Sequence, residues 1–364
     1  MRLIYFSRDY TTHDHRFLSA LAKTGHKIYF LRLERRGHQL EERPIPPEIE
    51  QVPWSGGQTP AGLRNGLRLL QDLKRVIAEI QPDLIQAGPI QRSAFLVALS
   101  GFRPLVGASW GYDLLHDAKR NALWGWVTRY TLKRSAVLVG DCNTIRQIAI
   151  SYGMPDERII TFPWGVDIKQ FSPALEKQID GDTFTLLSTR GWEQVYGVDI
   201  IARAFVQAAR ERSELHLTML GNGSQAAKLR RLFQKGGVSE RVSFPGQVGQ
   251  SDLPRYYQHA DLYVTASHSD GTSISLLEAM ACGRPVLVSD IPGNREWITP
   301  GVQGWLFPDG DVGALADAIL HANDERARLP EMGRAARHLA EQRADWEKNF
   351  LELLRAYELA LQTG

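Results

Sequence analysis

The sequence predicts an α/β protein made of two doubly wound, Rossmann-like domains, and three observations lead to this fold class. The chain has 364 residues, which exceeds the usual size of one domain. Short apolar runs of β type alternate along it with longer segments whose apolar residues recur at helical spacing. A turn-rich stretch at residues 163–182 separates two such alternating patterns. This alternation is typical of parallel sheets with helices on both faces.

The elements of the first half follow from its apolar runs. Strands are predicted at residues 2–7, 26–33, 83–87, 104–109, 136–141 and 158–163. Helical spacing predicts helices between them at residues 14–25, 68–80 and 143–153, and Gly25, Gly101 and Gly153 stand where helices would end. We therefore place the first domain at residues 1–165.

The second half repeats the scheme. Strands are predicted at residues 183–190, 215–221, 241–246, 261–267, 284–290 and 304–307, with helices that include residues 201–210 and 275–283. We place the second domain at residues 166–344. The amphipathic segment 345–364 follows the completed pattern, and we expect this last helix to pack back toward the first domain.

Composition limits the classes of protein and of partner. Hydrophobic residues make up 43% of the chain, enough for a core in each half. The two cysteines lie far apart and show no metal-ligand spacing, so we expect a reduced, cytoplasmic setting. No apolar run has the length of a leader or of a membrane span, which predicts a soluble chain, at most held peripherally at the inner face of a membrane.

Charge is shared unevenly between the halves. Residues 1–165 carry 22 Lys and Arg against 15 Asp and Glu, whereas the whole chain has a net charge of only +2. The first half therefore either faces something anionic or has an ordinary uneven surface. Nucleic acid is not the expected partner, because no basic and aromatic binding signature is present.

Residues 260–290 carry the clearest chemistry. A predicted strand runs into the loop 268–273, and a helix follows that contains Glu278. A glycine and hydroxyl turn before a helix offers free backbone N–H groups and the positive end of the helix dipole, which suit a diphosphate. Asp270 before the turn and Glu278 inside the helix can then bind hydroxyls on either side of it. The alternative is that Asp270 caps the helix and Glu278 faces solvent, although the apolar neighbours of Glu278 disfavour the latter.

Several motifs together resemble family 4 of the retaining glycosyltransferases. Asp270, seven intervening residues and Glu278-Ala-Met-Ala-Cys-Gly283 are similar to the family's hallmark, in which the first member is usually Glu. The segment 163–173 resembles the family's linker, and residues 217–224 and 241–248 resemble its Gly-x-Gly turn and its base-side loop. The resemblance implies the GT-B fold, in which two facing domains enclose a cleft and the second domain holds a nucleotide sugar.

The resemblance also implies roles for particular residues. Arg190 matches the family's Arg for the donor phosphates, while the Lys that usually follows is replaced near Tyr196, which either packs or binds phosphate. Arg190 and Asp270 are the expected catalytic residues. The expected donor-binding residues are Glu278, Gly271, Thr272, Ser273, Tyr196, Gly221, Gly223 and Val248.

The first half departs from the family pattern. A polar loop with His13 and Asp14 stands where many members have a Gly-rich loop, and it either contacts the acceptor or simply leads into a helix. Gln86 and Gly88 occupy the place of an expected His. Trp110, Gly111 and Asp113 resemble the family's His-Gly-x-Asp segment, with Trp in place of His. These residues are the candidate acceptor-side contacts.

Neither a metal nor another cofactor is expected. The pairs Asp180/Asp182 and Asp309/Asp311 have the spacing of a metal motif, but turn chemistry explains both of them.

A basic and aromatic segment at residues 119–134 suits the surface of an anionic membrane. Its tryptophans can equally pack into a core beneath a solvated basic face. The segment therefore leaves open a peripheral membrane contact.

The sequence as a whole predicts a retaining hexosyltransferase that uses a nucleotide sugar, such as a UDP-sugar, in the synthesis of envelope polysaccharide or glycoconjugate. Its acceptor would be a glycan, a lipid-linked sugar or a small molecule. Two other functions stay open, a nucleotide-sugar epimerase on the same fold and a non-catalytic protein that binds nucleotide sugars or glycans.

Overall fold

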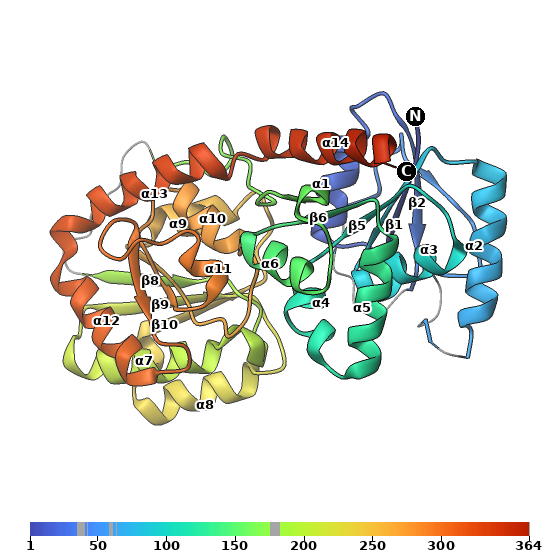
Figure 1. Ribbon diagram of the computed structural model, residues 1–364. Helices are drawn as coiled ribbons and strands as arrows, with labels where there is room; N and C mark the ends of the chain where they lie inside the picture. The colour runs from blue at the N-terminus through green and yellow to red at the C-terminus, as the bar shows by residue number, and fades with distance from the viewer. Residues whose placement is uncertain (35–40, 42, 58–60, 63, 175–182, 364) are drawn as a thin grey trace. The chain divides into compact units, whose positions relative to one another are not determined.

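The computed structural model of the chain describes residues 1–34, 41, 43–57, 61–62, 64–174 and 183–363, which form two compact units (Figure 1). Unit 1 comprises Met1–Phe162 and Phe350–Gly364, and unit 2 comprises Pro163–Asn349. Most of the last helix, α14 (Trp346–Thr363), therefore belongs to unit 1, although it follows unit 2 in the sequence.

A seven-stranded sheet organises unit 1, and every neighbouring pair of its strands is parallel. The order is β3-β2-β1-β4-β5-β6-β7, with β1 (Arg2–Ser7), β2 (Lys27–Arg32), β3 (Glu50–Gln51), β4 (Leu84–Gly88), β5 (Leu105–Ala108), β6 (Val137–Gly140) and β7 (Ile159–Thr161). Because parallel sheets are covered on both faces, the inner strands are buried along their length, as in β4 and β6.

The helices of unit 1 connect these parallel strands. They are α1 (Thr12–Leu21), α2 (Gly66–Ile80), α3 (Phe95–Ser100), α4 (Tyr112–Leu115), α5 (Ala122–Arg134) and α6 (Asn143–Ser151), with the π-helical turn η1 (Ile90–Ala94) and the 3-10 turns η2 (Asp117–Lys119) and η3 (Asp156–Arg158). The six strands predicted for this half are all present. The unpredicted β3 consists of two exposed polar residues, which carry no apolar pattern.

Unit 2 contains a six-stranded parallel sheet in the order β10-β9-β8-β11-β12-β13. Its strands are β8 (Phe184–Ser188), β9 (Leu215–Leu220), β10 (Val242–Gly246), β11 (Leu262–Thr265), β12 (Val286–Ser289) and β13 (Gly304–Phe307). Its helices are α7 (Val198–Glu211), α8 (Ala226–Gly236), α9 (Leu253–His259), α10 (Ile274–Ala281), α11 (Pro292–Arg295), α12 (Val312–Asp324) and α13 (Leu329–Arg343), with the 3-10 turns η4 (Gln194–Tyr196), η5 (Ser239–Arg241) and η6 (Arg326–Arg328).

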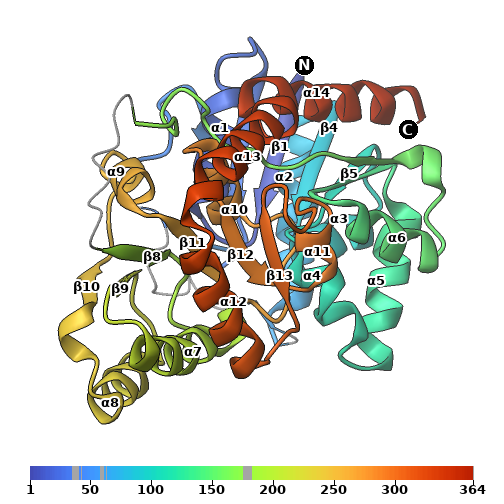
Figure 2. The same cartoon turned by 90° about the vertical axis from the view of Figure 1, so that its left-hand side faces the viewer.

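The apolar side chains of these strands point alternately to the two faces of the sheet and form one core on each face. Leu186 packs into one core and the next residue, Leu187, into the other, because successive side chains of a strand point to opposite faces. Helices α7, α8 and α12 lie along one side of the sheet and α9 and α10 along the other (Figures 1 and 2). Burial on both faces explains why these strands are apolar almost throughout.

Each sheet has one point where the direction of its strand order reverses. In unit 1 the reversal lies between β1 and β4, and in unit 2 it lies between β8 and β11. Loops that leave the carboxyl ends of two such strands run to opposite faces and leave a crevice, which is where open α/β sheets bind ligands. These two edges are therefore the places to look for sites.

Candidate functional site

Arg190 stands at the reversal point of unit 2, two residues beyond the end of β8. Its Nη2 lies 2.7 Å from Oδ2 of Asp270, in the loop that follows β11. Its Nη1 donates to Ser273 Oγ at 3.1 Å and to Ser275 Oγ at 3.3 Å. One guanidinium group thus joins the loop after β8, the loop after β11 and the first turn of α10. The structure brings together the two residues that the sequence predicts to be catalytic.

The partners of Arg190 leave part of its hydrogen-bonding capacity unused. Its Nε is buried without a hydrogen-bond partner, and so is Oδ2 of Asp270, because the ion pair is close but poorly aligned. Buried polar atoms in folded proteins are normally paired, so these two atoms make the edge a candidate place for a ligand group.

Electrostatics keep Arg190 charged. Burial lowers the pKa of its guanidinium, but the negative charge of Asp270 and the nearby tyrosines raise it more, so the net shift is upward. The guanidinium also lies 4.0 Å from the centre of the Tyr196 ring, in cation–π contact. Tyr196 is therefore a support for Arg190, in addition to packing partly against the core.

The first turn of α10 completes the anion-binding geometry that the loop predicts. Its N-cap, Ser273, has an extended backbone and makes no capping hydrogen bond with its side chain. The first N–H groups of a helix have no partners within the helix, and the helix dipole makes this end positive. Thr272 and Ser273 are buried here, and the backbone of Gly271 packs so closely on Gly293 of α11 that a Cβ at Gly293 would collide with it. The turn is thus held firmly in place.

Glu278 is a buried residue of α10, only 3% exposed, so it is not a solvated helix residue. Its Oε2 accepts a hydrogen bond of 2.8 Å from the Tyr257 hydroxyl of α9. That hydroxyl also lies 2.9 Å from Thr189 Oγ1, next to Arg190. Burial, followed by the charge of Glu278, raises the pKa of Tyr257 well above its usual value, so the hydroxyl keeps its proton.

The remaining predicted donor residues lie on neighbouring loops of unit 2. Gly221 has a left-handed backbone, with φ of +96°, and its N–H donates to Gly246 O at 2.7 Å. A Cβ at Gly221 would lie 3.2 Å from Arg190 O, so this turn lies directly beside Arg190. Gly223 lies against the backbone of Trp192, and Val248 is half-buried against one core. The structure places Gly221 and Gly223 next to the loop that carries Arg190.

Sequence reasoning missed four hydroxyl residues of this network, which are Thr189, Tyr257, Tyr263 and Ser275. The Tyr263 hydroxyl donates to Ser275 Oγ at 2.8 Å, and both residues are buried. Tyr263 carried a usable signal, since a tyrosine inside a buried strand needs a partner for its hydroxyl. Tyr257 lies on α9 and had no such signal, because only the fold brings α9 beside α10.

The Asp pairs with metal-motif spacing have other duties where the structure describes them. Asp311 caps α12 by accepting from Ala314 N at 2.9 Å. Asp309 Oδ1 lies 2.6 Å from Nδ1 of His268, in the loop after β11. Asp180 and Asp182 lie outside the described residues. Within the described ranges, no group of three or more His, Cys, Asp or Glu is placed to hold a metal ion.

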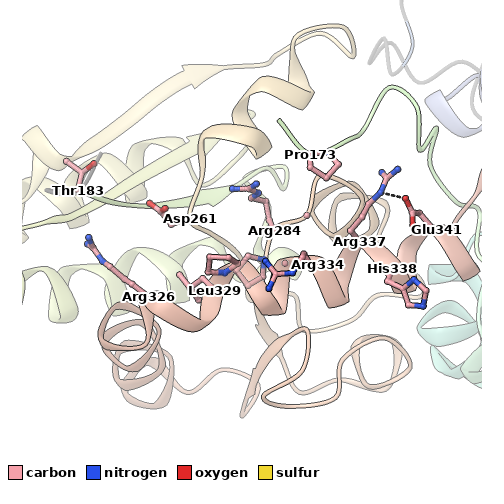
Figure 3. Close-up of a pocket in the computed structure, with 14 residues that line it drawn as sticks. Pro173, Thr183, Asp261, Arg284, Arg326, Leu329, Arg334, Arg337, His338 and Glu341 are labelled. Atoms are coloured by element: carbon pink, nitrogen blue, oxygen red, sulfur yellow. Dashed lines mark hydrogen bonds and ion pairs between the residues drawn. The ribbon is translucent and has the colours of Figure 1, made fainter. Parts of the chain in front are cut away.

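Figure 3 shows a pocket of about 410 Å³ in unit 2, at the edge of the sheet where its strands begin. Its lining residues Thr183, Asp261 and Pro285 directly precede β8, β11 and β12. Two of its arginines are engaged in the fold, since Arg284 donates to Ala260 O and Arg337 pairs with Glu341. None of the predicted site residues lines this pocket. Arg190 and Asp270 lie at the other edge, beyond the carboxyl ends of β8 and β11.

Asp14 in unit 1 is a helix-capping residue. Its carboxylate accepts from Thr11 N at 2.8 Å and from the Tyr5 hydroxyl at 3.0 Å, and it is completely buried. Its carboxylate is thus engaged inside the fold, which agrees with the alternative that this loop leads into a helix. The Thr-x-x-Asp spacing from Thr11 was the signal of a capping box.

Asp113 also serves the fold of unit 1. Its carboxylate accepts from Ile90 N at 2.9 Å, from Ser109 Oγ at 2.7 Å and from Leu114 N at 3.0 Å. Burial raises the pKa of Asp113 to about 6, and these hydrogen bonds counter only part of that effect. Asp113 therefore ties η1 to the loop after β5.

His13, Trp110 and Gly111 lie at the carboxyl edge of the unit 1 sheet. The rings of His13 and Trp110 are stacked with their centres 5.9 Å apart, and Gly111 has a φ of +86° at the start of α4. Gln86, at the place of the expected His, is buried in β4 and accepts a hydrogen bond from the Tyr357 hydroxyl of α14. Gln86 thus anchors the last helix to the first sheet.

Family models of glycosyltransferases match both halves of the chain. The model of the glycosyl transferases group 1 matches residues 174–339, and that of Glycosyltransferase Family 4 matches residues 11–170. A D-inositol 3-phosphate glycosyltransferase of Pseudarthrobacter chlorophenolicus is 29% identical over 225 residues, which are 59% of this chain and 53% of that protein. The chain spans about half the length of the first curated relatives that it matches.

Two further proteins extend the comparison. A GDP-mannose-dependent α-(1-6)-phosphatidylinositol monomannoside mannosyltransferase of Mycolicibacterium smegmatis is 25% identical over 300 residues, which cover 75% of this chain and 76% of that protein. The crystal structure of Anabaena HepE with UDP-glucose is 18% identical and has a TM-score of 0.79, with 98% of this chain and 99% of that chain covered. The likeness of the structures confirms the predicted fold class.

Proposed function

Because the chain belongs to the family 4 type of glycosyltransferases, we propose that it transfers a hexosyl group from a nucleotide sugar whose diphosphate binds at the Arg190 edge of unit 2. The observation that carries this proposal is the convergence of Arg190, Asp270 and the uncapped first turn of α10. Guanidinium and helix N–H groups are suited to phosphate oxygens, and their charge helps most as negative charge builds on the leaving diphosphate.

The Arg190–Asp270 ion pair gives each residue a role in the transfer. An incoming diphosphate competes with Asp270 for the guanidinium, which can hold two phosphate oxygens at once. Asp270 is then released from its ion pair and can accept hydrogen bonds from hydroxyls of the donor sugar. Glu278, which Tyr257 orients from the other side, is placed to accept hydrogen bonds from ribose hydroxyls.

The donor is proposed to be a UDP-sugar, and transfer to retain the configuration of the anomeric carbon. Support for the base comes from Anabaena HepE, whose structure holds UDP-glucose. Support for retention comes from kinship with the family, since no single residue of the site determines it. The acceptor is proposed to be a glycan, a lipid-linked sugar or a small molecule of the cell envelope.

A panel of UDP-, GDP-, ADP- and dTDP-sugars tests the activity. We expect one of them to release nucleoside diphosphate, slowly to water and faster with an acceptor extract, and the anomer of the product to be the same as in the donor. Conversion of the sugar to its epimer without nucleotide release would make the protein an epimerase. Tight binding without either reaction would make it a binding protein.

Contact with an anionic membrane surface is a further part of the proposal. On α5, Leu123 and Trp126 are 63% and 53% exposed, next to the basic residues Arg129 and Lys133. Exposed apolar and basic side chains on one helix suit an anionic lipid surface. Among the described residues, no helix combines the length and apolarity needed to cross a bilayer. Sedimentation with phosphatidylglycerol vesicles tests the contact, which Trp126→Ser should weaken.

A further inference from the structure

The carboxyl edge of unit 1 carries arginines at its own reversal point. Arg8 directly follows β1, and Arg92 lies in η1, the turn that follows β4. The strand order reverses between these two strands, which marks the ligand crevice of an open sheet. The turn that presents Arg92 is π-helical, a rare conformation that is often found at functional sites.

A third arginine joins this edge through Trp124. The guanidinium carbons of Arg92 and Arg120 lie 5.1 and 5.2 Å from the centre of the Trp124 ring. Neither arginine forms an ion pair with a carboxylate among the described residues. We name Arg8, Arg92, Trp124 and Arg120 the arginine cluster. Two cations on one aromatic ring, neither of them in an ion pair with a described residue, add positive potential at this edge, which attracts an anion.

Buried donors of the arginine cluster lack partners. Arg8 forms an ion pair with Glu34, yet its Nη2 is buried without a hydrogen-bond partner, and Nε of Arg92 is buried in the same state. Burial lowers the pKa of Arg92, and the positive charge of Arg8 lowers it further, which together outweigh the opposite effect of Glu34 and Asp117. Like charges and unpaired donors both destabilise the cluster, and an anionic oxygen ligand would relieve both.

We propose that the arginine cluster binds a phosphate ester on the acceptor of the transfer. The assignment rests on the proposed function, because the diphosphate of the donor has its own site at Arg190, which leaves the edge of unit 1 for the second substrate. Phosphate suits the cluster because guanidinium groups bind its oxygens in bidentate fashion and several of them share its charge. The phosphate can be carried by a soluble sugar or by a lipid.

Calorimetry on the full chain tests the assignment, with the donor site first saturated by UDP or GDP, whichever binds. Glucose 6-phosphate is the soluble probe, glucose is its uncharged match, and vesicles of phosphatidic acid supply a lipid-borne phosphate. Arg92→Gln and the exposed Arg120→Gln remove charges of the cluster. Arg134→Gln is the matched control, since Arg134 lies on the same helix and also packs over a ring, that of Tyr130.

We expect glucose 6-phosphate to bind and glucose not to bind, with the affinity reduced about tenfold or more in Arg92→Gln and Arg120→Gln and unchanged in Arg134→Gln. Binding to phosphatidic acid vesicles alone, lost in the same two variants, would assign the phosphate to a lipid. Equal affinity in all variants, or binding of neither phosphate, would overturn the assignment. Failure of every nucleotide to bind would instead overturn the donor site. The titrations with glucose 6-phosphate and with phosphatidic acid vesicles would still test the arginine cluster.

Discussion

Glu278 shows how one buried carboxylate can serve both the fold and a ligand. It is held by Tyr257 on one side, and it stands one and a half turns beyond the uncapped start of α10. A carboxylate that is buried and fixed in this way has already lost its side-chain freedom, so it can accept hydroxyl hydrogen bonds at little further entropic cost.

Glu278→Ala is therefore expected to weaken nucleotide binding by about 1.5–3 kcal/mol, the value of a charged hydrogen bond. Tyr257→Phe keeps the carboxylate but removes its donor, and it should cost only about 0.5–1.5 kcal/mol. Calorimetric titration with the preferred nucleoside diphosphate measures both variants. Unchanged affinity in Glu278→Ala would remove Glu278 from the site.

Asp113 makes a prediction about stability and pH. Its pKa is raised from 3.8 to about 6 in the folded protein. Between these two pH values, the folded state holds a proton that the unfolded state has released. The stabilisation is complete below about pH 3.8 and is lost as the pH rises through about 6, which amounts to about 3 kcal/mol. Asn does not titrate, so the free energy of unfolding of Asp113→Asn should not show this decrease with rising pH.

Urea unfolding at several pH values between 4 and 7 gives the slope of the free energy of unfolding against pH for each protein. Asp317→Asn, an exposed position on α12, is the control and should have the slope of the natural protein. Identical slopes for Asp113→Asn and the natural protein would contradict the raised pKa. The fully buried Asp14 shifts in the same direction and remains in both proteins.

At the scale of elements, the turn between η4 and α7 positions the Arg190 loop. Gly197 adopts a left-handed backbone with φ of +59°, and a Cβ there would collide with the carbonyl oxygen of Ala266, just beyond β11. His268 N donates to Val195 O at 2.9 Å beside it. The two loops of the site thus pack against each other through a contact that only glycine permits.

Gly197→Ala should lower the free energy of unfolding by about 3 kcal/mol and weaken nucleotide binding, because strain and collision add up. Gly237→Ala is the matched control, since Gly237 has a φ of +72° but nothing within 4 Å of an added Cβ. The control should cost only roughly 1–2 kcal/mol and leave binding unchanged. Equal effects of the two changes on stability and on binding would contradict this account.

The elements also show what the sequence can predict. Strands such as β8 and β11 were predictable because burial on both faces requires continuous apolar runs. The site loop was predictable because a turn of glycine and hydroxyl residues before a helix is suited to binding an anion. The network through Tyr257 and the bond by which Asp113 ties η1 to the loop after β5 were not, because each depends on residues that are distant in sequence and adjacent only in the fold.

The two units share one feature at the reversal points of their sheets. Each presents an arginine after the strand at its reversal point, Arg8 after β1 and Arg190 after β8. The two arginines differ in their carboxylate partners. Glu34 follows the neighbouring strand β2, whereas Asp270 lies across the reversal point, in the loop after β11. This common arrangement is the basis of our proposal that each unit binds one anionic substrate group.

Transfer is expected to proceed without a divalent metal. Arg190 and the first turn of α10 supply the positive groups for the diphosphate, while Asp309 is engaged with His268 and Asp311 with the start of α12. Turnover in excess EDTA should equal turnover without it. A rate that EDTA abolishes and Mn²⁺ restores would contradict the prediction.

The proposed function requires that the Arg190 edge of unit 2 binds the diphosphate of the donor and stabilises it as it leaves. Steady-state kinetics on Arg190→Ala, with the exposed Arg210→Ala of α7 as control and circular dichroism to check folding, test it most directly. We expect Arg190→Ala to lower turnover by roughly two to three powers of ten, more than it raises the donor KM, and Arg190→Lys to recover only part. Near-normal turnover in folded Arg190→Ala, equal to that of Arg210→Ala, would contradict the claim.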